Sequence, residues 1–514
     1  MGHHTITEVR QEKFDFSTRI KLIPILLFVV GAILAGVGAM QAKESWDSPR
    51  EEVTNAVNDH NAEASNSEAP DAHADHHLAL AEANSDSSVP STPEVPSTPE
   101  EPSVPEEPSV PEEPSVPDEN HAKVAHEEGA HASVEHAEAH GNHHEVTYMT
   151  RVWANLLLNS YYFWLFAVSA LFFIAVNYVA NAGWAVMLKR IMEAQSSYLL
   201  VGSILLFTII FLGKDTLYHW VQYFDGSAAG NPKDAGYDAI LESKHWLLNN
   251  SSIFFFVPFV LIVWYLIRTK LRRNSLAEDE TPGLDMFKNS TRWSAAFIFF
   301  FAFSFSALSW LIIMSLDAHW YSTMFSIYNF AISFVSGLSV MMLILQYLKS
   351  KGYMEMVSDE VVHDLGKFMF AFCVFWGYIF LSQWLLIWYT NLPEETVYFQ
   401  ARLNSHFKPL FFINLFMCFL IPFLTLMMRG AKRSPKVLLA AGLTILVGHW
   451  VDMYLLIMPG TVGDTADFGL LEIGTTMAFA GIFIYTVLHS LSKANLYPLN
   501  HPYLLESANH DVGV

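Results

Sequence analysis

Cysteine is almost absent from this 514-residue chain, in which only Cys373 and Cys418 occur. Both lie within apolar runs, and they form no CxxC pair, no CxxCH haem-attachment motif and no thiolate cluster. We therefore expect that the chain binds no cofactor covalently and holds no metal site. Any redox centre with which it works is expected to belong to a partner protein.

Basic residues are scarce between residues 41 and 150, where only Lys43, Arg50 and Lys123 oppose 25 Asp and Glu residues. The segment thus accounts for the whole net charge of −22. It repeats EEPSVP three times over 100–117 and holds 11 of the 22 histidines. Proline and mutually repelling carboxylates favour an extended tether over a folded domain. The histidines could hold zinc, copper or nickel, but no ligand geometry is implied, so we favour a spacer.

Charged residues are also rare in ten apolar runs of about 20 residues, the length that crosses a bilayer as a helix. Helices satisfy every backbone polar group in lipid, and no alternating barrel pattern occurs. We therefore predict an all-α membrane protein. The predicted spans are 22–40, 161–183, 197–213, 250–271, 293–316, 322–348, 366–390, 409–428, 435–455 and 469–489.

The first span could be a signal peptide cleaved after Ala39, but its length favours a retained anchor. Lys and Arg number 20 on the side of the N-terminus and 9 on the other side. The positive-inside rule then predicts that both termini are cytoplasmic. The expected regions are a cytoplasmic 1–21, the anchor 22–40, an extracytoplasmic tether 41–150, spans two to six in 151–348, spans seven to ten in 349–490 and a cytoplasmic tail 491–514.

Ionisable residues gather toward the outer ends of several predicted spans. Such groups usually face the bundle interior or water, and a histidine beside a carboxylate can relay protons near neutral pH. His449 and Asp452 stand out because they lie three apart inside an apolar span. The candidates for a proton path or a quinol-proximal site are His449, Asp452, Asp317, His319, Asp215, His219 and Glu472.

Acidic and aromatic residues on the same side are candidates for docking an extracytoplasmic protein, namely Glu394, Glu395, Trp320 and Tyr321. Pro393 and Pro459 are expected to end helices there and to order the loops. All these residue types are also ordinary at a membrane interface, where aromatic belts and turn residues need no further function. That simpler interpretation competes with the functional one for each residue.

Four stretches together resemble the NrfD-like, polysulfide-reductase-type membrane subunits: 151–194, SLDAHWYSTMF at 315–325, 362–399 and GHWVDMYLLIMP at 448–459. They are most similar to the second ten-span subunit of bacterial alternative complex III, a quinol:cytochrome c or electron-acceptor oxidoreductase. The resemblance implies two four-helix bundles, spans two to five and six to nine, flanked by the first and tenth spans. It also implies a bacterial inner membrane.

The partners that the resemblance implies are a sister ten-span subunit, an iron–sulfur and molybdopterin-enzyme-like subunit, c-type cytochromes and a terminal oxidase, with no role for nucleic acid. Haem c and iron–sulfur clusters would lie in those partners. We expect a non-redox subunit that gives scaffold and a proton path. One alternative is a subunit that binds quinol at the outer His and Asp residues. Another is a stand-alone cation transporter with a histidine-rich metal trap.

Overall fold

A computed structural model gives the fold and describes residues 8–9, 11–47, 146–226, 229–232, 234 and 236–511. The chain divides into two compact units, Met1–Asp47 with His143–Val514, and Ser48–Asn142. All of the described residues belong to the first unit, and most of the predicted tether lies outside them. Within the described residues, regular structure consists of helices and one isolated β-bridge between Lys13 and Asn495.

Ten helices in the described residues are long and apolar enough to cross a membrane, which confirms the predicted all-α membrane architecture. Short helices connect them or extend them at their ends. The spanning elements are α1 (Thr18–Asp47), α4 (Tyr148–Val179), α5 and α6 (Lys189–Gln195, Tyr198–Leu217), α9 (Val257–Glu280), α10 (Asp285–Ile312), α11 (Phe325–Ser350), α12 (Asp359–Thr390), α14 and α15 (Lys408–Leu415, Ile421–Leu426), α16 (Pro435–Thr461) and α17 (Leu470–Leu491). The connecting helices include α7 (His219–Asp225), α8 (Ala239–Lys244), α13 (Pro393–Leu403) and α18 (Leu504–Ala508).

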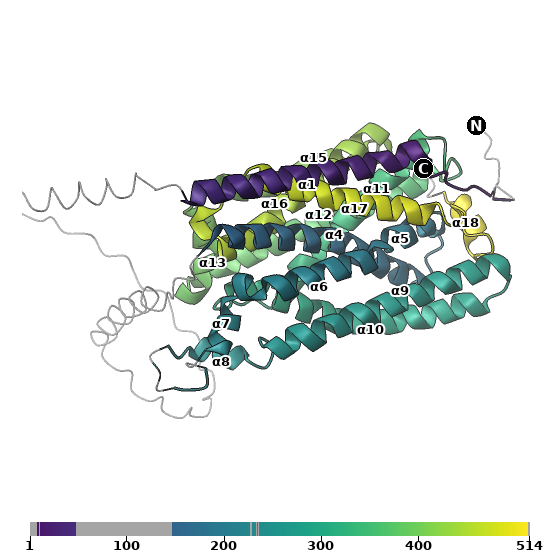
Figure 1. The fold of residues 1–514 in the computed structure, drawn as a ribbon. Coiled ribbons are helices and arrows are strands. Elements are labelled where there is room, and N and C mark those ends of the chain that lie inside the picture. Colours follow the sequence, from purple (N-terminus) through teal and green to yellow (C-terminus); the bar gives the residue numbers. More distant parts are fainter. Residues whose placement is uncertain are drawn as a thin grey trace, which may run out of the picture. The chain divides into compact units, whose positions relative to one another are not determined.

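Apart from α1 and α17, the spanning helices form two bundles, and α4 lies where the two bundles meet (Figure 1). The first bundle consists of α4, α6, α9 and α10, and the second of α11, α12, α14 with α15, and α16. Helix α4 also packs against α11 and α16, so it belongs to the first bundle and joins it to the second. Helices α1 and α17 pair with each other, and α17 packs on α4. We call the end at which α1 begins and α17 ends the inner end, and the opposite end the outer end.

Several helix boundaries differ from the predicted ones. Helix α4 begins at Tyr148, whereas the second span was predicted to begin at 161. The polar residues Arg151, Asn155 and Asn159 lowered the hydropathy of this stretch, but their side chains bond within the protein instead of facing lipid. Helix α1 likewise continues to Asp47, beyond the predicted end at residue 40.

The two prolines expected to end helices behave differently. Pro393 is the first residue of α13, where its missing N–H costs no helical hydrogen bond. Pro459 lies inside α16, which continues to Thr461, so the prediction that it ends the helix is wrong. The missing N–H leaves the carbonyl oxygen of Leu455 without its helical donor, and that oxygen accepts from Arg402 Nε at 3.0 Å instead.

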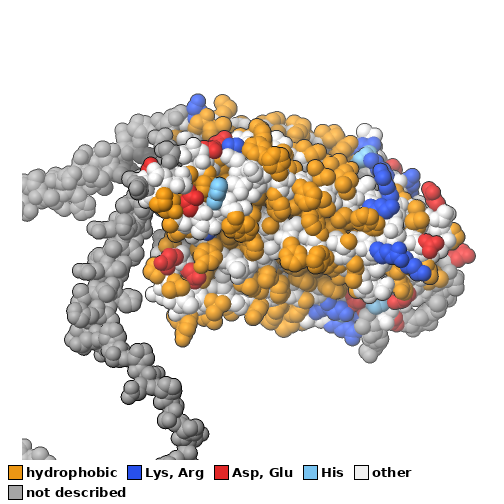
Figure 2. Space-filling view, turned by 90° about the horizontal axis from the view of Figure 1, so that it is seen from below, with side chains coloured by type: hydrophobic (Ala, Val, Ile, Leu, Met, Phe, Trp, Pro, Cys, Tyr) orange, Lys and Arg blue, Asp and Glu red, His pale blue; other side chains and the backbone are white. Residues whose placement is uncertain are grey.

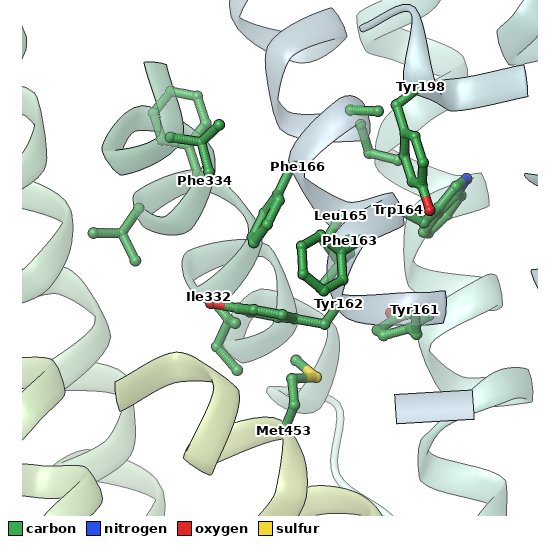
Figure 3. Packing of buried hydrophobic residues seen from close by; sticks show 14 of the residues in the cluster. Tyr161, Tyr162, Phe163, Trp164, Leu165, Phe166, Tyr198, Ile332, Phe334 and Met453 are labelled. Atoms are coloured by element: carbon green, nitrogen blue, oxygen red, sulfur yellow. The ribbon is translucent and has the colours of Figure 1, made fainter. Parts of the chain in front are cut away.

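The core between the two bundles is built on aromatic residues of α4. Tyr161, Tyr162, Phe163, Trp164 and Phe166 are all buried. Figure 3 shows them between residues of other elements: Tyr198 from α6, Ile332 and Phe334 from α11, and Met453 from α16. Because consecutive residues of a helix point in different directions, this aromatic run covers the whole circumference of α4. Helix α4 is therefore an interior helix.

The lateral surface is apolar, as a bilayer requires. Large side chains such as Phe299 and Phe303 on α10 are 72% and 68% exposed. Figure 2 shows hydrophobic side chains across the middle of the molecule, whereas lysine and arginine gather mainly toward the right-hand end, where α1 begins. This distribution agrees with a protein that spans a membrane.

Helices α1 and α17 approach each other through glycines spaced seven residues apart on both helices. A Cβ at Gly31 would lie 2.4 Å from the backbone nitrogen of Ala478, and one at Gly474 would lie 2.2 Å from that of Ala35. Gly38 and Gly481 have equally close backbone neighbours. Small residues let two membrane helices gain dispersion contacts along their backbones, which drives association in lipid. The same contacts fix α1 at its place against the bundle.

We predict that Gly31→Val separates α1 from α17, because the new side chain would collide with backbone that cannot move aside. Overpacking of this kind costs about 1–3 kcal/mol. Gly36→Val is the matched control on the same helix, since a Cβ there meets nothing within 4 Å. Thermal unfolding in detergent measures both. Equal unfolding temperatures for the two variants would contradict the close packing.

Candidate functional site

His449 and Asp452 lie near the middle of α16. His449 is 14 positions after Pro435 and 12 positions before Thr461, which places it roughly 20 Å from either end of the helix. The sequence placed the pair in the last turns of a shorter span, at the outer side. Both side chains are instead enclosed in the second bundle, with His449 0% and Asp452 2% exposed.

The carboxylate of Asp452 receives hydrogen bonds from three helices of the second bundle. The hydroxyl of Tyr328 on α11 donates to Oδ1 at 2.6 Å, and the amide Nδ2 of Asn414 on α14 donates to the same oxygen at 2.9 Å. The indole Nε1 of Trp376 on α12 donates to Oδ2 at 3.0 Å. Together with α16, which carries Asp452, each helix of the second bundle contributes one side chain to this hydrogen-bonded group. Three converging donors suit an ionised carboxylate, which is an acceptor only.

The imidazole of His449 lies beside this carboxylate, with Nδ1 3.5 Å from Asp452 Oδ2. The ring of Trp376 meets it edge to face, with centroids 5.4 Å apart. Neither ring nitrogen has a hydrogen-bond partner among the described residues. A buried polar group usually has a partner, and an exception marks a site with a further role or an unplaced water. Among the described residues of the second bundle, His449 shares this property with His363 of α12, and it is the one that lies beside the Asp452 carboxylate.

Cys418 completes the group from the eighth span. Its Sγ donates to Asn414 Oδ1 at 2.9 Å. The Sγ of Cys418, a ring nitrogen of His449 and a carboxylate oxygen of Asp452, all potential metal ligands, lie within 4.8 Å of one another. The span has a π-helical turn here, η4 (Phe416–Leu420), a feature often found at functional sites. Gly448 permits the close approach, because a Cβ there would lie 2.8 Å from Cys418 Sγ.

This arrangement, which we call the Asp452 cluster (Tyr328, Trp376, Asn414, Cys418, His449 and Asp452), can hold and exchange protons. Imidazole is the side chain that most commonly exchanges protons near neutral pH, and carboxylates are common partners in proton transfer. In a low-dielectric interior, a proton on His449 would create a cation beside the anion of Asp452 and be stabilised by it. The tyrosine and cysteine offer further exchangeable hydrogens.

Glu472 forms a second buried site, separate from the Asp452 cluster. Arg151 of α4 donates Nε to Oε1 and Nη2 to Oε2, each at 3.0 Å, in a bidentate pair. Asn155 Nδ2 donates to Oε1 at 3.0 Å, and the backbone N–H of Gly469 donates to Oε2 at 2.8 Å. Glu472 is 0% exposed, so the pair is desolvated and each partner depends on the other. It fixes the outer end of α17 to α4.

Two other predicted residues, His219 and His319, lie at the outer surface in a group of their own. His319 Nε2 and Asp238 Oδ2 are 2.6 Å apart, and the ring of His219 stacks on that of His319 at 5.5 Å. Burial opposes the ionisation of Asp238, but hydrogen bonds from His319 and from backbone N–H groups outweigh it, so the pKa of Asp238 lies below its ordinary value. Asp238 was not among the predicted residues.

The remaining predicted residues do not join either buried site. Asp215 is exposed and pairs with the neighbouring Lys214, and Asp317 is half-buried in the loop before α11. The predicted outer cluster is thus divided among the Asp452 cluster, the Glu472 site and the surface group of His219 and His319. Helix α16 continues to Thr461, beyond the predicted end at residue 455, and this places His449 and Asp452 deeper than the other candidates.

The four docking candidates differ in exposure. Trp320 is 4% exposed and stacks on Tyr398 of α13 at 4.0 Å, so it anchors a loop and offers little surface to a partner. Tyr321 is 62% exposed. Glu394 is exposed and Glu395 half-buried, both in the first turn of α13, where acidic residues complement the helix dipole.

Sequence reasoning missed the donors around Asp452 and the partners of Glu472. Tyr328, Trp376 and Asn414 carry no signal on their own, because each looks like a common residue of an apolar helix. Arg151, Asn155 and Asn159 do carry one, since their spacing of four places them on one face of a helix. That stripe could have predicted both the early start of α4 and an interior polar contact.

A buried ionic network at the inner end was also missed. Lys189 Nζ bonds to Glu278 Oε2 at 2.9 Å, and Arg190 Nη1 bonds to Glu193 Oε2 at 2.8 Å. Arg190 also pairs with Asp279, and Arg272 with Glu193. These pairs connect the segment before α6 to the end of α9. They close the inner end of the first bundle.

His501, in the segment after α17, packs over this network between Tyr178 and Phe287. Burial, with the nearby charges of Lys189 and Arg190, lowers the pKa of His501 to about 2, although Glu193 acts in the opposite direction. The ring is therefore neutral when the C-terminal segment is docked.

We predict that Glu472→Gln strongly destabilises the protein, because it removes the buried counter-charge of the Arg151 guanidinium and leaves only the exposed carboxylate of Asp467, 3.9 Å away. Breaking a buried pair in this way costs roughly 3–5 kcal/mol. Glu394→Gln is the control, since it removes one exposed carboxylate and should change stability by less than about 0.5 kcal/mol. Unfolding in detergent at neutral pH measures both. Equal stability of the two variants would contradict the structural role of Glu472.

We predict that docking of the C-terminal segment weakens as pH falls below about 6.5, the pKa of a free histidine. The undocked state then binds a proton that docked His501 does not, so stability is present above this pH and is lost below it. Between pH 6.5 and 5 the loss reaches about 2 kcal/mol. Amide hydrogen exchange of residues 495–508 measures it. His501→Phe should remove this pH dependence, and an unchanged dependence in that variant would assign it to another group.

Three of the four stretches singled out in the sequence contribute residues to the two buried sites. Residues 151–194 contain Arg151 and Asn155, 362–399 contain Trp376, and 448–459 contain His449 and Asp452. No protein-family model matches the chain, and no curated protein matches it.

Proposed function

We propose that this chain is a non-redox integral membrane subunit of a quinol-oxidising respiratory complex similar to alternative complex III. In this proposal its second bundle carries protons by way of the Asp452 cluster, and its first bundle is mainly scaffold. The resemblance of the four stretches supports the assignment to such a complex. The geometry around Asp452 supports the part played by protons.

The observation that carries the proposal is the environment of His449. A histidine that only filled space would have its nitrogens satisfied by neighbours, because an unpaired buried donor or acceptor costs about 1–3 kcal/mol. Here both ring nitrogens lack a partner among the described residues, while a carboxylate with three donors lies 3.5 Å away. Ionisable groups inside a membrane bundle commonly serve ion or proton movement.

The scaffold role is supported by the position of α4 and by the exposed apolar faces. Helix α4 packs against helices of both bundles, so a movement in one is opposed by the other. On α12, Trp388 and Tyr389 are 64% and 81% exposed near the outer end. Such side chains suit contact with lipid headgroups or with a second membrane subunit.

The proposal includes a bacterial inner membrane with both termini in the cytoplasm. The bridge between Lys13 and Asn495 supports a common side for the termini, and the bias of Lys and Arg supports the cytoplasmic one. The outer end would then meet the proposed partners, namely c-type cytochromes and an iron–sulfur subunit. The sister ten-span subunit would supply the quinol site.

We predict that Asp452→Asn, introduced into the intact complex, preserves quinol oxidation but lowers proton translocation at least tenfold. The amide fills the same volume and cannot take up a proton. Oxidation by added quinol and acidification by reconstituted vesicles are measured separately. Asp285→Asn is the control, because that carboxylate is exposed in the first turn of α10, away from both buried sites, and its loss should change neither activity.

Two outcomes would contradict the proposal. If Asp452→Asn leaves proton translocation unchanged, the cluster is structural. If it instead raises the KM for quinol with normal coupling, the chain binds quinol itself. Failure of the chain to copurify with haem- and iron–sulfur-containing subunits would refute the assignment to a respiratory complex, whatever the cluster does.

A further inference from the structure

A long groove runs along the outside of the molecule, away from the Asp452 cluster. Its volume is about 680 Å³, within the range of roughly 300–1,000 Å³ that ligand pockets occupy. Its walls come from α1 and α17 on one side and from α11 and α16 on the other. Tyr162, Phe163 and Phe166 of α4 also line it (Figure 3).

The groove is parallel to the helices and open to the side. Its lining on α17 extends from Glu472 to Leu488, a distance of sixteen residues or roughly 24 Å along the helix. This is more than half of a hydrocarbon core about 30 Å thick. Ile23, Leu443 and Val447 line it and remain 64%, 50% and 52% exposed. A ligand can therefore enter from the bilayer without passing through water.

The outer end of the groove offers no free polar group to a ligand. Trp450 Nε1 and Thr476 Oγ1 both donate to Asn159 Oδ1, at 3.1 and 2.9 Å. The carboxylate of Glu472 is occupied by Arg151, Asn155 and Gly469. Along the groove, the hydroxyl of Tyr162 donates to the carbonyl oxygen of Leu446 at 2.7 Å. A polar headgroup at this end would find no partner, so this end suits the apolar end of a chain.

The inner end has the opposite character. Ile20 and Leu488 line it, and the basic residues Lys21 and Lys493 lie beside them in the chain. The ring of Phe16 lies 6.3 Å from that of His489, which follows Leu488 directly and precedes Lys493 by four residues. Lys21 Nζ lies 5.4 Å from the ring of Phe16, and no described carboxylate forms an ion pair with either lysine. Two cations thus lie at one end of an apolar groove.

We propose that this groove binds an anionic phospholipid, with an acyl chain along α17 and the phosphate group near Lys21 and Lys493. The charge at the inner end and the satisfied polar groups at the outer end together favour this occupant. An isoprenoid quinone would have its polar ring at an end with hydrogen-bond partners and would gain nothing from the two cations. The lipid would cover α1 and α16 at once and stabilise α1 on the bundle. This inference is independent of the proton role proposed for Asp452.

The test uses the purified full chain and two kinds of variant. Lys21→Gln with Lys493→Gln removes the cations, and Ala480→Phe fills the groove with a half-exposed residue that lines it. Phosphatidylglycerol and phosphatidylcholine are the probes, and native mass spectrometry counts the molecules retained. Lys270→Gln with Lys351→Gln is the charge-matched control, since both lysines are exposed and neither lines the groove.

We expect one phosphatidylglycerol to bind the wild type at least tenfold more tightly than phosphatidylcholine does, since each basic residue near an anionic lipid contributes about fivefold. The double variant at Lys21 and Lys493 should lose this preference, the control pair should keep it, and Ala480→Phe should lose the bound lipid. Retention by Ala480→Phe at the wild-type level would overturn the proposal. So would equal loss in both lysine pairs, or displacement of the lipid by a short-chain quinone at equal concentration. Crosslinking from a photoreactive residue at Val447 to a polypeptide instead of lipid would assign the groove to a protein partner.

Discussion

The buried carboxylate of Asp452 is the constraint on which the second bundle depends. A charge in a membrane interior is costly unless hydrogen-bond donors surround it, so the helices around Asp452 must present donors at one depth. Tyr328, Trp376 and Asn414 meet this requirement from α11, α12 and α14. These hydrogen bonds fix the position of each helix along its axis and its rotation about that axis. A network of this kind specifies a single arrangement of helices in which apolar packing alone would permit several.

Helix α4 of the first bundle is joined to α17 by a separate set of buried polar contacts. Arg151, Asn155 and Asn159 form a line along α4 that bonds to Glu472, Thr475 and Thr476 of α17. Asn159 also accepts from Trp450, which follows His449 in α16. The Glu472 site and the Asp452 cluster are thereby connected through adjacent residues of one helix.

The two buried sites also explain why the lateral surface is mainly apolar. The carboxylates of Asp452 and Glu472 are satisfied by donors inside the protein, and the lateral surface carries apolar side chains that suit lipid. Charge appears at the ends, mainly as lysine and arginine at the inner end. The groove between α1 and α16 is consistent with this division, because its polar lining groups are satisfied internally and its cations lie at one end.

The sequence by itself determined the fold class and the ten spans, because hydropathy and helix length are local properties. It also identified His449 and Asp452, which are three residues apart on one helix. Only the tertiary structure decided their depth, because α16 continues to Thr461. It also decided the start of α4, since Arg151, Asn155 and Asn159 lower hydropathy equally whether they face water or a partner such as Glu472. It alone placed Tyr328, Trp376 and Asn414 around Asp452, because residues 38 to 124 positions distant meet only after the helices pack.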